Sequence, residues 1–420
     1  MSKAGKKKIL SLFTGCGGMD LGFEGGFKVK RESVNEKIHP DWLDDVDSSW
    51  VTLPETDFET IFANDIVRAA KASWEPWFQK KGIRDKRFEL NSIVDLVKMH
   101  EEGQQIFPPT DILTGGFPCQ DFSIAGKRGG FESSKGHHGK LLDEGDDPTE
   151  ENRGKLYVWM KKAIEIALPK VFIAENVKGL VTLADAKEVI QKDFSEVGPG
   201  YLVVDPRVLH AADYGVPQGR ERVIFIGIRK DILKKKAIAE LSKSVIAEEY
   251  DPYPTPTHLA PGLLDYSQCL KHVPSGVYLG DLPEPDMSHD LSQQSYSKAK
   301  FYGTHCQGQT EVRLDKIAPT IRSEHHGNIE FRRLSRENGG TSTTELSRKL
   351  PQRRLSVREC ARLQTFPDEF QFVRPASDLG PDYKVSASEG YKLIGNAVPP
   401  LLAFHIAWRI QCLWPKLFKR

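Results

Sequence analysis

The chain has 420 residues, of which 39% are hydrophobic, and its 59 basic and 58 acidic side chains leave a net charge of +1. This length suits one large domain and a smaller one. The net charge alone does not indicate a nucleic-acid partner, so any DNA-binding face must come from local segregation of charge.

The six cysteines form no CxxC pair, which argues against a zinc cluster and against a disulfide scaffold. Residues 1–8 are basic but lack the apolar stretch of a signal peptide, and no apolar run reaches the length of a membrane span. We therefore expect a soluble intracellular protein with no membrane partner.

The first half of the chain alternates strand and helix patterns. Residues 156–168 carry apolar side chains at helical spacing. Strand-length apolar runs with β-branched or aromatic residues lie at 9–13, 60–63, 111–114, 171–174 and 223–226. This alternation predicts an α/β fold in which helices cover both faces of a parallel sheet and ligands bind beyond the carboxyl ends of the strands.

The pattern changes after about residue 229. Proline and glycine become frequent, and residues 298–358 hold 13 basic and 6 acidic side chains. The apolar segment 401–413 then predicts a buried helix that returns to the first domain. We predict a first domain over residues 1–250, completed by 385–420, and a smaller, irregular domain over 251–384.

Polar, glycine-rich motifs fall at the ends of the predicted strands. The turn FTGCGG at residues 13–18 allows close approach to a ligand, although such turns are about as often structural. Asp65 ends the second strand, where an acid either holds ribose hydroxyls or caps a helix. Cys119 follows a Gly-Gly turn and a proline. A lone cysteine is more often a buried thiol than a nucleophile, but this placement exposes it.

Two further motifs could complete a site. Glu175, in the sequence AENV, ends another strand of the same sheet and could face Cys119, or could serve only as a cap or a salt bridge. Arg220 and Arg222 stand two apart in QGRER. On extended chain both would point the same way and could grip a carboxylate, a phosphate or a base oxygen.

The order of these motifs resembles that of the DNA (cytosine-5)-methyltransferase family of bacterial restriction-modification type. FTGCGG, GGFPCQDFS, AENVKGL and PQGRER are similar to the family's first, nucleophile, glutamate and arginine motifs, and RECARLQ and GNAVPP to its ninth and tenth. The resemblance covers nearly the whole chain. It implies a Rossmann-like, S-adenosyl-L-methionine-binding catalytic domain over 1–250 with 385–420, and a target-recognition domain and hinge over 251–384.

By this resemblance the chain methylates C5 of a specific cytosine in double-stranded DNA. Cys119 would attack C6 of a flipped-out base, and Glu175 would stabilise the ring at N3 and the exocyclic amine. Arg222 would hold the base O2 and orient Glu175, and Arg220 would support the same pocket. The expected cofactor contacts are Phe13, Gly15, Gly17, Gly18, Asp65, Ile66, Ser92, Ile93, Pro118, Leu156, Asn396, Ala397 and Val398.

The variable segment of roughly residues 251–350, called the recognition segment below, would read the flanking bases in the major groove, and its excess of basic side chains would contact phosphates. A solvated basic face is nearly as common for any one residue of that segment. The His325-His326 pair is not enough for a metal site, and no metal is expected. The candidate DNA-binding residues are Gln120, Ser123, Gln218, Arg322, His325, His326, Arg332 and Arg333.

The resemblance also implies a cytoplasmic, nucleoid-associated prokaryotic monomer that protects host DNA from a cognate restriction endonuclease. Three alternatives stand beside it. The long recognition segment disfavours an RNA cytosine methyltransferase on the same fold. The intact Cys119, Glu175 and Arg222 disfavour a non-catalytic DNA-binding regulator. The Pro-Cys-Gln sequence and the lack of a GxGxxG motif disfavour a nicotinamide oxidoreductase.

Overall fold

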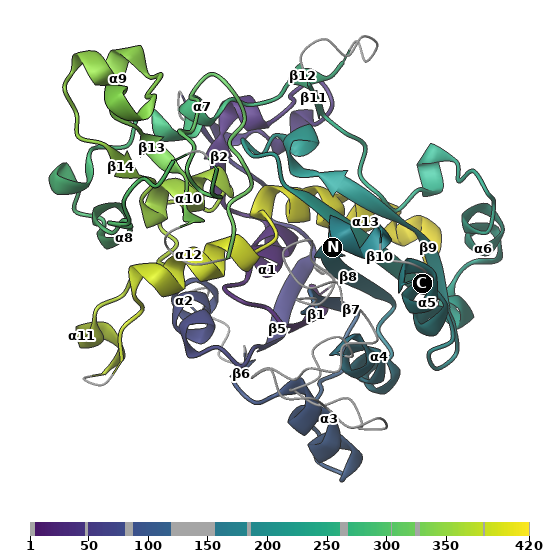
Figure 1. The fold of residues 1–420 in the computed structure, drawn as a ribbon. Coiled ribbons are helices and arrows are strands. Elements are labelled where there is room, and N and C mark those ends of the chain that lie inside the picture. Colours follow the sequence, from purple (N-terminus) through teal and green to yellow (C-terminus); the bar gives the residue numbers. More distant parts are fainter. Residues whose placement is uncertain are drawn as a thin grey trace.

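The computed structural model describes residues 5–46, 49–79, 87–118, 156–182, 186–260, 268–303, 305–323, 328–380 and 383–419. Its centre is a seven-stranded sheet in the order β6-β5-β1-β7-β8-β10-β9 (Figure 1). The neighbours from β6 to β8 pair in parallel, whereas β10 is antiparallel to both β8 and β9. The strands are β1 (Lys7–Leu12), β5 (Phe58–Asn64), β6 (Arg87–Glu89), β7 (Ile112–Gly115), β8 (Val171–Val177), β9 (Tyr201–His210) and β10 (Glu221–Arg229).

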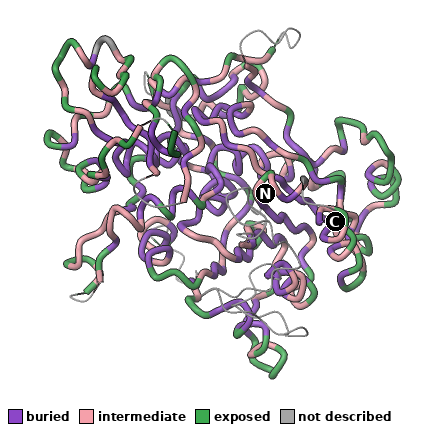
Figure 2. Tube along the Cα trace, viewed as in Figure 1, coloured by how far each residue is buried: buried purple, intermediate pink, exposed green. Residues whose placement is uncertain are grey.

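Both faces of this sheet are buried. Along β8, Val171 and Ile173 join one hydrophobic cluster and Phe172 and Ala174 join another, because successive strand residues point to opposite faces. Figure 2 shows buried residues gathered along the central strands. The predicted α/β fold, with a mainly parallel sheet covered on both faces, is confirmed.

Helices supply the two covers. The cluster on one face includes side chains of α3 (Ile93–Glu101), α4 (Leu156–Ala167) and α5 (Ala186–Ser195). The cluster on the other face includes side chains of α1 (Gly18–Glu24), α2 (Arg68–Phe78) and the C-terminal α13 (Pro400–Leu417). Because β6, β5, β1, β7 and β8 run parallel, their carboxyl ends lie along one edge of the sheet, between the two helical layers.

The C-terminal helix packs tightly on α1. A Cβ on Gly22 would lie 2.4 Å from both the Pro400 carbonyl oxygen and Ala403 Cβ, so only glycine permits this approach. The stretch Ala387–Leu417, which spans α12 (Ala387–Asn396) and α13, is long and apolar enough to cross a membrane by length and composition. However, 78% of its most apolar window is buried within the protein, as in the core helix of a globular fold.

The remaining elements are short. Leu355 and Phe366 belong to the same hydrophobic cluster as α1 and α13, so the core continues across residue 250 and the predicted domain boundary there stays a prediction. These elements are β2 (Lys28–Lys30), β3 (Asp44–Val46), β4 (Trp50–Thr52), α6 (Lys235–Leu241), β11 (His258–Leu259), β12 (Leu270–Lys271), α7 (Ser275–Leu279), α8 (Leu291–Gln294), β13 (Phe331–Arg333), α9 (Thr343–Ser347), β14 (Arg353–Arg354), α10 (Val357–Leu363) and α11 (Ala376–Leu379).

His405 of α13 is buried in the core, and the partly buried His39 packs near it. The ring of His39 stacks on Trp42 at 3.8 Å between centroids and lies 5.6 Å from the ring of His405. Burial lowers the pKa of His39 to about 4, against a smaller opposing effect of Asp41, and lowers the pKa of His405 well below its usual value. Both imidazoles are therefore neutral in the folded protein near neutral pH.

Stability should fall as the pH is lowered from 6.5, the ordinary pKa of histidine, to about 5. In this window the unfolded chain binds protons that the folded chain excludes, and each unit of pKa difference is worth roughly 1.4 kcal/mol. Urea unfolding at a series of pH values measures the slope. His405→Gln should flatten it, whereas His289→Gln, at an exposed position, should not. An unchanged slope in His405→Gln would contradict this account.

Candidate active site

Strand polarity brings the sequence motifs to one edge of the sheet. The glycine turn follows β1, Asp65 follows β5, Gly116 follows β7, and Glu175 lies near the end of β8. Because β10 is antiparallel to β8, its beginning lies at the same edge, with Arg222 opposite Val177. In α/β sheets this is the edge where ligands bind.

Glu175 and Arg222 form an ion pair across β8 and β10. Arg222 Nε lies 2.7 Å from Glu175 Oε1, and the arginine and glutamate side chains are only 13% and 10% exposed. Arg222 Nη1 also donates to the Glu221 carbonyl at 2.8 Å. Charges shielded to this degree depend on one another, because water no longer solvates either fully. The arginine therefore fixes the position of the carboxylate at the sheet edge.

The loop after β7 is built around this carboxylate. A Cβ on Gly116 would lie 2.6 Å from Glu175 Oε2, so a larger residue would push the carboxylate aside. Asn176 Nδ2 donates to the Phe117 carbonyl at 3.2 Å, and Asn176 Oδ1 accepts from Val177 N at 2.8 Å. Asn176 thus tethers the loop to the strand of Glu175. Sequence reasoning missed this role, although Asn176 stands in the same motif as Glu175.

The predicted nucleophile lies beyond the part of this loop that the structure describes. Pro118, half-buried, is the last described residue, and Cys119, Gln120 and Ser123 lie outside the described residues. Burial raises the pKa of the Cys16 and Cys360 thiols. A buried, protonated thiol is a poor nucleophile, so neither offers an alternative to Cys119.

Asp65 shapes the glycine turn after β1. Its Oδ2 accepts from Gly15 N at 2.8 Å and its Oδ1 accepts from Val67 N at 2.9 Å. Burial raises the pKa of Asp65, and the hydrogen bonds from these backbone N–H groups oppose the rise. Gly15 and Gly17 both adopt left-handed backbone, with φ of 55° and 87°. The carboxylate therefore has a structural partner in the turn, and its ribose contact stays a prediction.

Apolar side chains lie open beside this turn. Ile66 is 59% exposed, and Phe13 is partly buried against the cluster that contains Ile93 and Leu156. A Cβ on Gly15 would meet nothing within 4 Å, so the turn is open to a ligand. An adenosine group needs an apolar surface for its base and polar groups near its sugar. These residues fit S-adenosylmethionine in both respects.

The tenth motif lies on the other side of the turn. A Cβ on Gly18 would lie 2.4 Å from the Val398 carbonyl oxygen and 3.1 Å from Ala397 Cβ. Asn396 is exposed at the end of α12. The first and tenth motifs, which lie almost 380 residues apart in the sequence, are therefore adjacent at the predicted cofactor site.

Ser92 already has a structural role. Its hydroxyl accepts from Val94 N at 3.2 Å and serves as the N-cap of α3, which is what a serine at a helix start favours. This bond accounts for the residue without a ligand, and the contact with adenine stays a prediction.

Arg220 and Gln218 are buried against main-chain atoms of later parts of the chain. Arg220 is fully buried and donates from Nη1 and Nη2 to the carbonyls of Ile321 at 3.1 Å and Gly395 at 2.9 Å. Gln218 is equally buried. It accepts from Ile321 N at 2.8 Å and donates to the Leu363 carbonyl at 3.2 Å.

The expectation that Gln218 contacts DNA is therefore corrected, because its side chain is fully buried, whereas the support that Arg220 gives to the pocket stays a prediction. Both side chains bind the backbone of later segments. We expected Arg220 and Arg222 to point the same way, as residues two apart do in a strand. This rule does not apply to Arg220, because β10 begins only at Glu221. The preceding residues form a turn in which Arg220 N donates to the Gln218 carbonyl at 3.0 Å.

Arg332 and Arg333 also turn inward. Arg332 pairs with Glu345 at 2.6 Å, and Arg333 pairs with Glu345 at 2.9 Å and with Glu284. The two arginines are 5% and 1% exposed. Their expected role in DNA binding is corrected, because a guanidinium buried against carboxylates is not available to a phosphate.

The other residues expected to contact DNA in this segment are placed differently. Arg322 is half-exposed, and its backbone packs on Gly395, where a Cβ would lie 2.3 Å from the Arg322 carbonyl oxygen. His325 and His326 lie outside the described residues. The Arg322 side chain is therefore partly accessible, and its DNA contact stays a prediction.

Comparison with known proteins identifies the family. A model of the C-5 cytosine-specific DNA methylase family matches residues 7–412. The chain belongs to this family. It is a DNA cytosine-5 methyltransferase that uses S-adenosylmethionine, so the predicted enzyme class and cofactor are confirmed.

Its relatives include methyltransferases of restriction-modification systems. The chain is 31% identical to Type II methyltransferase M.BsuRI of Bacillus subtilis, over 97% of this chain and 81% of that protein. It is 32% identical to Type II methyltransferase M.BspRI of Lysinibacillus sphaericus, over 96% and 81%. A solved structure of a Spodoptera frugiperda DNMT2 mutant covers 97% of this chain and 100% of its own, with a TM-score of 0.53 and 15% identity, and this likeness shows the fold alone.

Gly116→Ala should impair catalysis more than folding. The added methyl group would displace the Glu175 carboxylate, and a misplacement of about 1 Å at a reacting group costs about 10²-fold in rate. We expect kcat for methyl transfer to fall by about that factor, while the Kd for S-adenosylmethionine and the Tm change little.

Gly219→Ala is the matched control for this substitution. Its Cβ would meet its nearest neighbour, Ile317 Cδ1, at an ordinary 3.4 Å, so kcat should stay at the wild-type value. Full activity in Gly116→Ala, or equal losses in the two variants, would show that the loop is not built around the carboxylate.

Proposed function

We propose that this methyltransferase is the modification enzyme of a Type II restriction-modification system. It would methylate one cytosine in a short double-stranded recognition sequence and so protect host DNA from a cognate endonuclease. Relatives that cover nearly the whole chain carry the name Type II methyltransferase. The observation that carries the chemistry is the shielded Glu175–Arg222 pair at the edge where the cofactor turn and the loop leading to Cys119 meet.

The proposed nucleophile is Cys119. Cytosine C5 is a poor nucleophile, but a bond from the Cys119 thiolate to C6 moves an electron pair of the ring toward C5. S-adenosylmethionine, when bound, supplies the methyl group that C5 takes up. A base or a water molecule then removes the C5 proton, the C5–C6 double bond forms again, and the thiolate leaves.

Glu175 is proposed to share a proton with N3 of the ring as the thiolate adds. Arg222 holds one oxygen of this carboxylate through its Nε at 2.7 Å, which leaves the guanidinium at the edge where the base O2 would lie. An orientation fixed before the substrate binds requires little rearrangement during the reaction. The target base must be flipped from the duplex, because both faces of its ring are covered in the stack.

Exposed basic side chains of the recognition segment replace Arg332 and Arg333 as candidate phosphate contacts. Phosphate contacts position a protein on the duplex, whereas contacts with base edges read the sequence. Arg313 is exposed but already pairs with Asp315 at 2.6 Å. The other exposed candidates between residues 298 and 358 are Lys298, Lys300, Lys316, Arg336, Arg348 and Lys349.

Covalent trapping tests the mechanism. Mixed-sequence duplexes that contain 5-fluorocytosine should form an adduct with the wild-type enzyme when S-adenosylmethionine is present, because the fluorine at C5 cannot leave as a proton does. Cys119→Ser should form none. An adduct in Cys119→Ser, or no adduct with the wild-type enzyme on any such duplex, would refute the proposed nucleophile.

Plasmid protection tests the biological role separately. Plasmid DNA from cells that express the chain should resist one endonuclease of a panel, and plasmid DNA from cells that express Cys119→Ser should be cut. Bisulfite sequencing should place the methylated cytosine in one fixed short sequence. Methylation without fixed neighbouring bases, or methylation of RNA in place of DNA, would overturn this role and leave the family assignment intact.

A further inference from the structure

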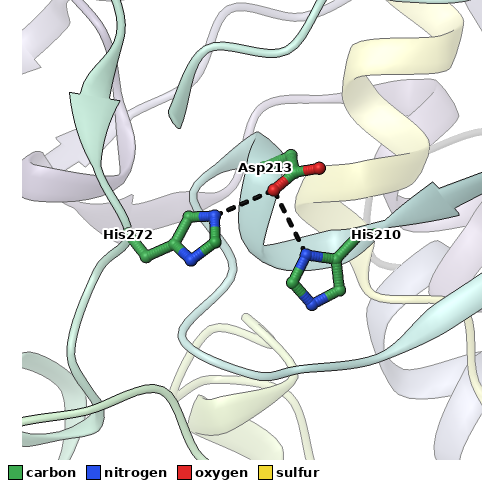
Figure 3. Close-up of side chains that lie close together, drawn as sticks. All are labelled: His210, Asp213 and His272. Atoms are coloured by element: carbon green, nitrogen blue, oxygen red, sulfur yellow. Dashed lines mark hydrogen bonds and ion pairs between the residues drawn. The ribbon is translucent and has the colours of Figure 1, made fainter. Parts of the chain in front are cut away.

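Three side chains converge where the catalytic sheet meets the start of the recognition segment. His210 ends β9, Asp213 lies in the turn that follows, and His272 comes directly after β12. His210 Nδ1 lies 3.2 Å and His272 Nε2 lies 2.8 Å from the same oxygen, Asp213 Oδ1 (Figure 3). The three candidate ligand atoms lie within 4.8 Å of one another, and all three residues are half-buried.

This donor set suits a divalent transition-metal ion. Two imidazole nitrogens and one carboxylate oxygen are ligands that Zn²⁺ accepts, with bonds of about 2.1 Å, and tetrahedral ligand atoms then lie roughly 3.4 Å apart. The nitrogen–oxygen separations of 2.8 and 3.2 Å fall slightly short of that value. An ion could enter after a small outward movement of the two rings, and it would replace the protons that the rings now direct at the carboxylate.

Backbone hydrogen bonds hold the three ligands in place without an ion. Ala211 N donates to the Arg220 carbonyl at 2.7 Å, and Thr257 N donates to the Asp213 carbonyl at 2.9 Å. His272 N donates to the Leu259 carbonyl at 3.0 Å. Binding of an ion would therefore not have to order a loop, whereas in sites that fold only with metal part of the binding free energy offsets the cost of ordering the chain.

A neighbouring histidine is not available as a fourth ligand. His258 Nδ1 lies 2.9 Å from Thr257 Oγ1, and its Nε2 lies 3.1 Å from the Glu32 carbonyl, so both ring nitrogens are occupied. A site with three protein ligands leaves a position for water, which agrees with the partial exposure of the His210 and Asp213 side chains, each 29% exposed.

We propose that His210, Asp213 and His272 bind one divalent transition-metal ion such as Zn²⁺, with solvent in the remaining position. The ion would join β9 to the start of the recognition segment. His210 pairs with Glu221 in β10, one residue before Arg222, so the site anchors the recognition segment close to the strand of the Glu175–Arg222 pair. Sequence reasoning missed the site because His272 lies 59 residues from Asp213, although the His210-x-x-Asp213 spacing is visible.

Metal titration of the tag-free, full-length protein tests this site. Isothermal titration with Zn²⁺ should show a single saturable site of micromolar affinity or tighter, and Co²⁺ should give the visible absorption of a tetrahedral complex. Zn²⁺ at a hundredfold excess over its Kd should raise the Tm by about 3 °C for a chain of this size. Absence of a saturable site in the wild-type protein would overturn the proposal.

Variants assign the site. His272→Gln and, independently, Asp213→Asn should abolish the Zn²⁺ isotherm and the Tm rise, and a Tm measured without metal shows whether each variant folds. The control is His289→Gln, which removes an exposed histidine that is not one of the three candidate ligands and should leave the binding unchanged. Binding that is lost in this control, or that persists in His272→Gln, would assign the ion to another place and refute the proposal.

Discussion

Glu175 and Arg222 hold one another across β8 and β10, at a place where neither charge is well solvated alone. The pair requires that β10 be antiparallel to β8. A parallel β10 would carry Arg222 to the opposite edge of the sheet, away from the turn after β1 and the loop after β7. Gly116 leaves space for the carboxylate, and Asn176 ties the loop to the same strand. The active-site edge is therefore arranged around one ion pair and the strand reversal that makes it possible.

Much of this edge could be predicted from the sequence. A sheet covered on both faces needs strands that are apolar throughout, and the runs at 9–13, 60–63, 111–114, 171–174 and 223–226 fall on β1, β5, β7, β8 and β10. The direction of β10 could not be predicted, because apolar pattern carries no information about strand polarity. The burial of Arg220 could not be predicted for a related reason. Residues two apart point to the same side only within a strand, and β10 begins at Glu221, one residue after Arg220.

The count of charged residues in the recognition segment wrongly predicted a DNA-facing role for Arg332 and Arg333, because it ignored ion pairs that form only in the folded protein. Between residues 298 and 358 the excess of basic side chains suggested a DNA-facing surface, but Arg332, Arg333, Arg353, Arg354 and Arg358 are buried. Several of their acidic partners, Glu284, Asp290 and Glu359, lie outside that window. A local sum of charges cannot include partners that only folding brings close. The buried arginines hold this small, strand-poor region together.

Arg220 and Gln218 bind main-chain atoms of Ile321, in the proposed recognition segment, and of Leu363 and Gly395, which follow it in the chain. A peptide group offers the same hydrogen-bond donor and acceptor whatever side chain its residue carries. The hydrogen bonds of Arg220 and Gln218 therefore do not depend on the side chains of the residues that they bind. Such an anchor tolerates exchange of the residues that face DNA while the catalytic edge stays unchanged. Substitutions at exposed positions of the proposed recognition segment would therefore leave these main-chain contacts, and with them the catalytic edge, in place.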